Sequence, residues 1–129
     1  MGPPSFAPIY DTARGLFWNH SDAKLRGKIE AGQRDTFIRQ YAERSASLIG
    51  VPQVAEKPNH FSVIRYVIEN SSQVYRDAVA DVIRSFRPDV VRRMLDQRFG
   101  RLFSPMRLLF IDDLLRYRHA RLLEILRGN

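Results

Sequence analysis

The chain has 129 residues, enough for one domain, and its 44% hydrophobic and 27% charged content is typical of a globular protein. It has no Cys, which excludes disulfides and thiolate metal sites, and no apolar run approaches the roughly 20 residues of a membrane span. The formal net charge of +7 permits contacts with phosphates or with an acidic protein without specifying either. We expect a cytoplasmic protein without a signal peptide, because no basic stretch followed by an apolar one opens the chain.

Residues 1–20 are predicted to form an extended arm, since Pro8 disfavours helix in the residue before it and Gly15 interrupts any helical pattern. Asp11 lies within this arm. One interpretation of Asp11 is a metal ligand, because phosphoryl transfer needs a carboxylate that holds Mg²⁺ against the phosphates. The other is an ordinary loop Asp that caps the backbone following it. Spacing alone does not separate the two, because one carboxylate is never a metal site by itself.

Basic and aromatic side chains in and after the arm pose the same choice between binding and packing. Phe17 and Trp18 are expected to pack, because aromatic residues beside an apolar one usually become buried. The basic residues either contact an anion or lie in solvent as ordinary charges. The candidate anion contacts are Arg14, Lys24, Arg26 and Lys28, and the same two interpretations apply to Arg92, Arg93, Arg116 and Arg118.

Helical signals begin directly after the arm. Ser21 is predicted to cap a short helix that ends near Gly32. A second helix is predicted to start at Asp35 and to end by Gly50. Residues 50–58, which contain two prolines, are predicted to form a loop.

Three further helices follow this loop in the prediction. Asn59 is the expected N-cap of a helix that continues to about Asn70, with apolar residues at three- and four-residue steps. Ser71 and Ser72 cap the next helix, and Pro88 lies in the first turn of the one after it. The buried stripe of the helix after Ser72 is predicted to consist of Val74, Ala78, Val79, Val82, Ile83 and Phe86.

The last helix has the best-marked ends, with Ser104 as N-cap, Pro105 as first helical residue and Gly128 as C-terminal stop. Its apolar residues cover more than a single stripe, which indicates neighbours on more than one side. The sequence therefore predicts an all-α protein, a bundle of five or six helices. A single helical domain over residues 21–129 follows the extended arm at residues 1–20.

Motifs for catalysis and for metal binding are few. His20, His60 and His119 are far apart, and no Cys accompanies them, so a structural metal site is not expected. The sequence also has no Gly-rich phosphate loop and no nucleophile elbow. We therefore assign no catalytic residue within this chain.

The segment Ala7–Asn19, with Pro-Ile-Tyr-Asp at its centre, resembles the Pro-X-Tyr-Asp segment of HipA-like Ser/Thr kinases of the toxin–antitoxin type. In that family the Asp is a metal ligand that corresponds to the Asp of the protein-kinase DFG motif. The resemblance implies that Asp11 is the metal ligand of a complete kinase and that Mg²⁺ and ATP are its cofactors. It also implies that the partner is the remainder of the kinase or an antitoxin-like protein.

The helical remainder of the chain resembles the same family more loosely. Asn-His-Phe at residues 59–61 is similar to a recurring helix start, and Leu-Leu-Arg-Tyr-Arg at residues 114–118 is similar to part of its closing helix. The resemblance implies that nearly the whole chain is the helical part of the kinase C-lobe. The family's Asp-x-His-x-x-Asn-like catalytic loop and its ATP-covering loop do not occur in these residues, so we expect no phosphoryl transfer by this chain alone.

A second hypothesis is a free-standing basic helical module that binds nucleic acid or an acidic protein. The two hypotheses differ at the apolar residues of the arm. Part of a kinase is expected to leave them uncovered, whereas a free-standing module is expected to bury them. These residues are Ile9, Leu16, Phe17 and Trp18.

Overall fold

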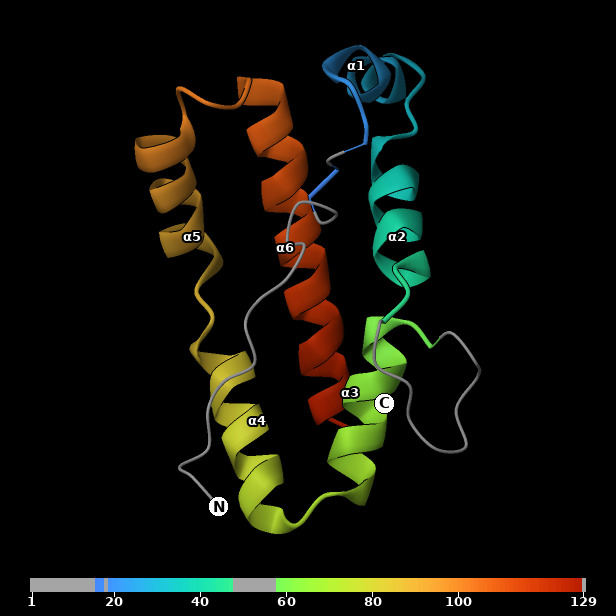
Figure 1. The fold of residues 1–129 in the computed structure, drawn as a ribbon, viewed down its shortest axis with the longest axis vertical. Coiled ribbons are helices and arrows are strands. Elements are labelled where there is room, and N and C mark those ends of the chain that lie inside the picture. The colour runs from blue at the N-terminus through green and yellow to red at the C-terminus, as the bar shows by residue number, and fades with distance from the viewer. Residues whose placement is uncertain (1–15, 18, 48–57, 129) are drawn as a thin grey trace, which may run out of the picture.

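The computed structural model describes residues 16, 17, 19–47 and 58–128, and this part of the chain is all-α, as predicted (Figure 1). It contains six α-helices and one π-helical turn, and none of these helices is long and apolar enough to cross a membrane. The elements are α1 (Asp22–Glu30), α2 (Arg34–Arg44), α3 (His60–Asn70), α4 (Gln73–Ser85), α5 (Pro88–Met94), the π turn η2 (Leu95–Phe99) and α6 (Pro105–Leu126).

Helix α6 is the centre of the fold. The other five helices all pack against it, and Figure 1 shows α2 and α5 on opposite sides of α6. Helices α3 and α4 form a hairpin along its C-terminal half, while α1 lies across its N-terminal end. This arrangement confirms the prediction, made from its wide apolar surface, that the last helix has neighbours on several sides.

Local capping signals set the ends of three helices as predicted. The side chains of Ser21 and Asn59 accept hydrogen bonds from backbone N–H groups in the first turns of α1 and α3, at 3.2 and 2.8 Å. The Ser104 hydroxyl accepts from the Arg107 N–H at 3.2 Å, at the start of α6. At the other end of α6, Gly128 has a φ of 81°, a left-handed conformation that glycine adopts without strain.

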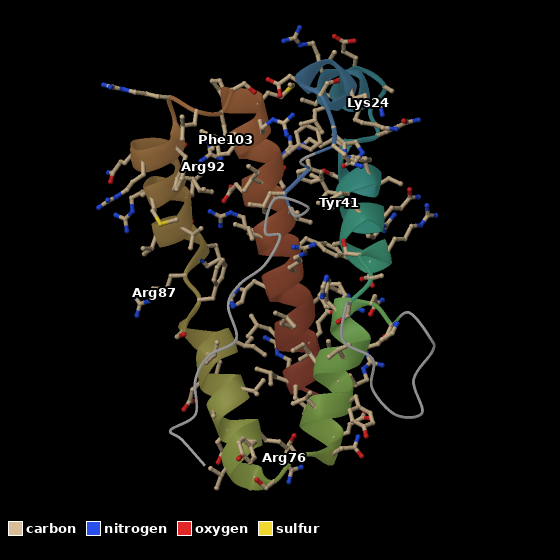
Figure 2. The ribbon with its side chains drawn as sticks, viewed as in Figure 1. Lys24, Tyr41, Arg76, Arg87, Arg92 and Phe103 are labelled. Atoms are coloured by element: carbon tan, nitrogen blue, oxygen red, sulfur yellow. The ribbon has the colours of Figure 1, made fainter. Side chains whose placement is uncertain are left out.

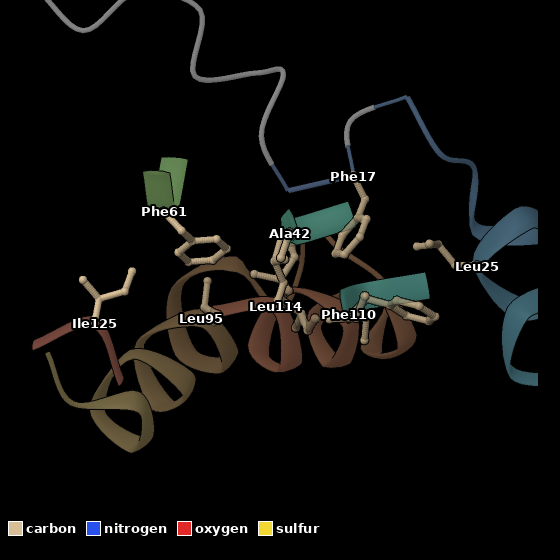
Figure 3. Close-up of a cluster of buried hydrophobic side chains, with 11 residues drawn as sticks. Phe17, Leu25, Ala42, Phe61, Leu95, Phe110, Leu114 and Ile125 are labelled. Atoms are coloured by element: carbon tan, nitrogen blue, oxygen red, sulfur yellow. The ribbon is translucent and has the colours of Figure 1, made fainter. Parts of the chain in front are cut away.

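One buried apolar cluster joins the helices to the segment that precedes α1 (Figure 3). Each of α1, α2, α3 and α6 contributes to it, η2 adds Leu95, and Phe17 comes from residues 1–20, which were assigned to the arm. The buried members are Phe17, Leu25, Ile38, Ala42, Phe61, Leu95, Leu108, Phe110, Ile111, Leu114 and Ile125.

The second helix ends well before Gly50, the latest end predicted for it. Helix α2 ends at Arg44, several residues before Gly50, because Ser45 has an extended ψ of 107° and its hydroxyl donates to the Tyr41 carbonyl at 2.7 Å. Ala46 then forms an antiparallel bridge with Asn59, which brings the start of α3 back beside the end of α2. The predicted loop at 50–58 lies outside the described residues except for its last position.

The predicted buried stripe of α4 is wrong in part. Val74 is 76% exposed and Val82 is 71% exposed, whereas Ala80 and Ile83 are buried. The apolar residues of α4 extend around two sides of the helix, and α3 and α6 cover only the side that carries Ala80 and Ile83. A stripe read from one helix cannot show which of two apolar sides its neighbours will cover.

Adjacent residues of α4 test this burial pattern. Replacing buried Ile83 with Ala removes packed methyl groups and is expected to lower the free energy of unfolding by about 2–4 kcal/mol. Replacing exposed Val82 with Ala is expected to change it by about 0.5 kcal/mol or less. Urea unfolding followed by circular dichroism measures both variants, and equal losses would contradict the orientation of α4.

Candidate functional site

Among the described residues, the candidate site is the group of interacting side chains where the arm meets the helices. Phe17 is completely buried there, with its ring centroid 4.3 Å from that of Tyr41 and 5.7 Å from those of Phe37 and Phe110. Its neighbours come from α2 and α6, two elements far apart in the sequence. We call Phe17, His20, Phe37, Tyr41 and Arg107 the arm anchor.

The backbone of the arm anchor has an uncommon conformation. Leu16 has a φ of 61° and Phe17 a φ of 65°, both in the left-handed region that residues other than glycine seldom adopt. Such a conformation costs about 1–3 kcal/mol per residue and persists only where the surroundings enforce it. Here the Phe17 N–H donates to the Tyr41 hydroxyl at 3.1 Å, and the Phe17 carbonyl accepts from the Arg107 guanidinium at 3.0 Å.

Arg107 is the polar centre of the arm anchor. Its Nε donates to Oδ1 of Asp22 at 2.9 Å, while Nη1 donates to the Phe17 carbonyl and Nη2 to the His20 carbonyl. The side chain is only 15% exposed. The planar fork of a guanidinium can serve several acceptors at fixed angles, so one residue of α6 holds both the arm and the first residue of α1.

Two helix starts are coupled at this point. Hydrogen bonding from Ser104, followed by hydrogen bonding and charge attraction from Arg107, holds the pKa of Asp22 below its ordinary value. Ser104 is also the N-cap of α6, and Asp22 is the first residue of α1. A carboxylate at a helix N-terminus also interacts favourably with the helix dipole. The starts of α1 and α6 therefore stabilise each other.

His20 lies at the edge of the aromatic group, with its ring centroid 5.2 Å from that of Phe37 and 5.9 Å from that of Tyr41. Burial lowers the pKa of His20, and the nearby charges of Lys24, Arg107 and Lys28 lower it further. Its buried Nδ1 has no hydrogen-bond partner among the described residues. The neutral imidazole is therefore the form that fits this site at neutral pH.

The structure describes three of the four candidate anion contacts, and their surroundings differ. Lys24 and Lys28 both lie close enough to His20 to affect its pKa, and the Lys28 ammonium lies over the Phe37 ring, 5.4 Å from its centroid. Lys24 and Arg26 are exposed. Arg14 and Asp11 lie outside the described residues, so their roles stay predictions.

The other ambiguous arginines divide into two groups. Arg92 and Arg116 both pair with the buried carboxylate of Asp112, at 3.4 and 3.1 Å, and therefore have structural partners. Arg118 donates to the Ser45 hydroxyl at 3.4 Å, and burial lowers its pKa. Within the described ranges Arg93 has no ion pair. In that same part of the chain, no group of three His, Asp or Glu side chains is placed to hold a metal ion.

Sequence reasoning predicted the packing of Phe17 but missed Arg107, which the apolar pattern of the last helix gives no reason to single out. The only local signal is its position three residues after Ser104, where its N–H meets the capping hydroxyl. Phe17 is fully buried against rings of α2 and α6, which is the outcome expected of a free-standing module and not the one expected of part of a kinase. Leu16 is 37% exposed, and Ile9 and Trp18 lie outside the described residues.

Comparison of the chain with protein-family models, with curated proteins and with solved structures gives no match. What the fold and site define directly is an all-α helical protein with a buried anchor for its N-terminal segment. The anchor serves to position the chain, because the donors of Arg107 are directed at two backbone carbonyls and at one carboxylate.

Replacing Arg107 with Lys tests the anchor while keeping the positive charge. An ammonium cannot reproduce the three-acceptor fork, so we expect the free energy of unfolding to fall by about 1–3 kcal/mol. Hydrogen exchange of the Phe17 and His20 amides should also accelerate. The matched control is Arg84→Lys on the exposed side of α4, which is expected to change stability by about 0.5 kcal/mol or less.

Stability should fall on mild acidification because of His20. Its folded pKa lies below the ordinary value of 6.5, so below that pH the unfolded chain binds more protons and gains population. The pKa of His60 is lowered in the same direction, by burial and by Arg118. The pKa values of Asp22 and Glu43 are also lowered. They reduce the stability of the fold only at more acidic pH, below the ordinary pKa values of 3.8 for Asp22 and 4.5 for Glu43.

We therefore expect the melting temperature to decrease from pH 7 to about pH 5, and His20→Gln to reduce this decrease. His60→Gln should remove a further part of it. Calorimetric melting at several pH values provides the measurement. A wild-type melting temperature that stays constant over this range would contradict the assignment of a neutral His20.

Proposed function

We propose that this chain is the C-terminal helical part of the C-lobe of a HipA-like Ser/Thr protein kinase, located in the cytoplasm. In this role it supports the active site, docks partner proteins and does not transfer phosphate alone. The observation that supports the proposal is the Pro-Ile-Tyr-Asp segment around Asp11, and the arm anchor holds the chain six residues after that Asp. Phe17, which belongs to the segment that carries the family resemblance, is thereby part of the buried helical core.

The anchor restricts where Asp11 can lie. Six residues of chain cannot carry its Cα further than about 22 Å from the Cα of Phe17, whatever conformation they adopt. Phe17 itself is held by ring packing and by two backbone hydrogen bonds. This tether keeps Asp11 within reach of the helical core, and the finer placement that a metal ligand needs would come from contacts in the complete kinase.

The family resemblance implies which catalytic groups this chain would supply and which the remainder of the kinase would supply. Mg²⁺ and ATP are the implied cofactors, and bound Mg²⁺ would neutralise charge on the transferred phosphoryl group. Asp11 would be this chain's contribution to holding the ion. The catalytic base, the second metal ligand and the ATP-covering loop would come from the remainder of the kinase, which together with an antitoxin-like protein is the proposed partner.

A second candidate function is favoured by a separate observation. Arginines on the outer side of α5 and η2 have no carboxylate partner among the described residues, which suits binding of an anionic macromolecule. This candidate corresponds to the basic helical module that binds nucleic acid or an acidic protein, and it does not require the kinase.

The role of Asp11 is testable in the complete reading frame that contains this chain. With the full protein expressed and purified, we expect ATP-dependent phosphorylation, and we expect Asp11→Asn to reduce it by about 100-fold or more. Incorporation of labelled phosphate gives the rate, and circular dichroism shows whether the fold is kept. Asp81→Asn, at an exposed position of α4, is the control and should leave the rate unchanged.

Near-normal phosphorylation by the Asp11→Asn protein would remove the metal-ligand role. A complete reading frame that encodes no Asp-x-His-x-x-Asn-type loop would remove the kinase proposal as a whole. Loss of activity in the Asp81→Asn control would show that the assay reports general damage and not the site.

A further inference from the structure

The outer side of α5 and η2 combines exposed apolar side chains with arginines. Val90 and Met94 of α5 are 47% and 42% exposed, and Leu102, just beyond η2, is 74% exposed. A shallow depression of about 360 Å³ lies on this side. We call the surface formed by the lining residues the docking face. They are Val90, Arg93, Met94, Gln97 and Arg98.

The charges around the docking face are unbalanced on its outer side. Residues 87–101 contain five Arg and two Asp. Both carboxylates already have partners directed toward α6: Asp96 pairs with Arg92 at 3.0 Å, and Asp89 pairs with Arg116 at 2.8 Å. Within the described ranges, the remaining four arginines make no side-chain ion pair or hydrogen bond. They are Arg87, Arg93, Arg98 and Arg101.

Arg92 and Arg87 of this segment thus differ in the side of α5 on which they lie. Arg92 lies on the α6 side, where it also reaches Asp112 at 3.4 Å, while Arg87 points away from α6 (Figure 2). The inward arginine neutralises local carboxylates and leaves the outward ones uncompensated. A solvated surface needs no such separation, because scattered pairs would serve solubility equally well.

The π turn η2 helps to shape this surface. Its hydrogen bonds join residues five apart, and Arg93 and Arg98, which are five apart, both line the depression together with Met94. A Cβ at Gly100 would collide with the Asp96 carbonyl, so the turn requires glycine at its end. π turns inside helices are frequent at functional sites.

We propose that the docking face binds a segment of a partner protein in which carboxylates flank one or two large apolar side chains. An apolar side chain of the segment would pack on the exposed side chains of Val90 and Met94, at the edge of a depression that is otherwise lined by polar residues. The two guanidinium groups beside it suit carboxylates, which they can bind in a bidentate manner. The Gln97 amide is placed to hydrogen-bond the segment's backbone.

Nucleic acid and anionic membrane fit the same surface less well. Phosphates would satisfy the arginines but would leave the exposed Val90 and Leu102 without apolar contacts, and base stacking requires more than the single ring of Phe99. A membrane would cover a broad convex surface, whereas this one contains a depression of side-chain size. Charge and shape together favour the protein segment.

The docking face does not depend on the kinase proposal. It lies on α5, on the opposite side of α6 from α2 and the arm anchor (Figure 1). Its test accordingly uses binding and not phosphorylation, so the failure of one proposal leaves the other standing.

The experiment titrates the full chain with synthetic peptides in which Glu alternates with Leu and Phe, followed by NMR. We expect saturable shifts confined to residues 87–102. Two control peptides replace Glu with Gln or replace Leu and Phe with Ala, and each should bind about tenfold more weakly or worse. Duplex DNA and vesicles that contain phosphatidylserine serve as the competing probes.

Charge reversal locates the contact. The double variant Arg93→Glu and Arg98→Glu should weaken binding of the acidic apolar peptide by about tenfold or more. The matched double variant Arg65→Glu and Arg84→Glu changes net charge equally on exposed positions of α3 and α4 and should bind normally. Should either reversal unfold the chain, the same positions changed to Gln give the comparison.

Equal weakening in both double variants would reduce the interaction to non-specific charge attraction and overturn the proposal. So would equal binding of the Gln peptide, shifts outside residues 87–102, or the absence of saturable shifts. Tighter binding to duplex DNA or to the vesicles than to the acidic peptide would replace the protein segment with that partner.

Discussion

Helix α6 can exist in water only if other elements cover it on several sides, and the rest of the fold follows from this constraint. A helix of 22 residues with buried side chains at Leu108, Phe110, Ile111 and Leu114 has no single apolar stripe to hide. Burying apolar surface stabilises the fold by about 25 cal/mol per Å² of apolar area. No single neighbouring helix can cover the whole apolar surface of α6. Five helices pack against α6, and the order of the chain decides the place of each.

Polar contacts distribute these neighbours along α6. Arg107 holds α1 through Asp22, Asp113 accepts from Arg34 of α2 at 2.8 Å, and Asp112 holds α5 through Arg92. Toward α3, the Arg121 guanidinium lies 5.5 Å from the centroid of the Phe61 ring, and toward α4 the His119 ring meets the Ile83 carbonyl at 2.9 Å. Apolar burial is not directional, so contacts of this kind are what determine the register of each neighbour.

The arm anchor also combines apolar burial with directional polar contacts, here to hold a loop in place of a helix. Its fully buried ring supplies the apolar part, and the fork of Arg107 supplies the directional part. The two left-handed residues before α1 show that the surrounding contacts outweigh a local backbone preference. On the far side of α6 the inward arginines are paired and the outward ones are not, which separates the structural charges from those available to a partner.

The sequence by itself determined the helical class, the starts of α1, α3 and α6, and the stop at Gly128. These features depend on a side chain and the backbone within about four residues of it. Tertiary structure alone decided which side of α4 is covered and what Arg107 holds. Val74 and Ile83 are both apolar in the sequence, and only the positions of α3 and α6 make one exposed and the other buried. Arg107 reaches acceptors that lie 85 to 90 residues away along the chain, a separation that no local pattern records.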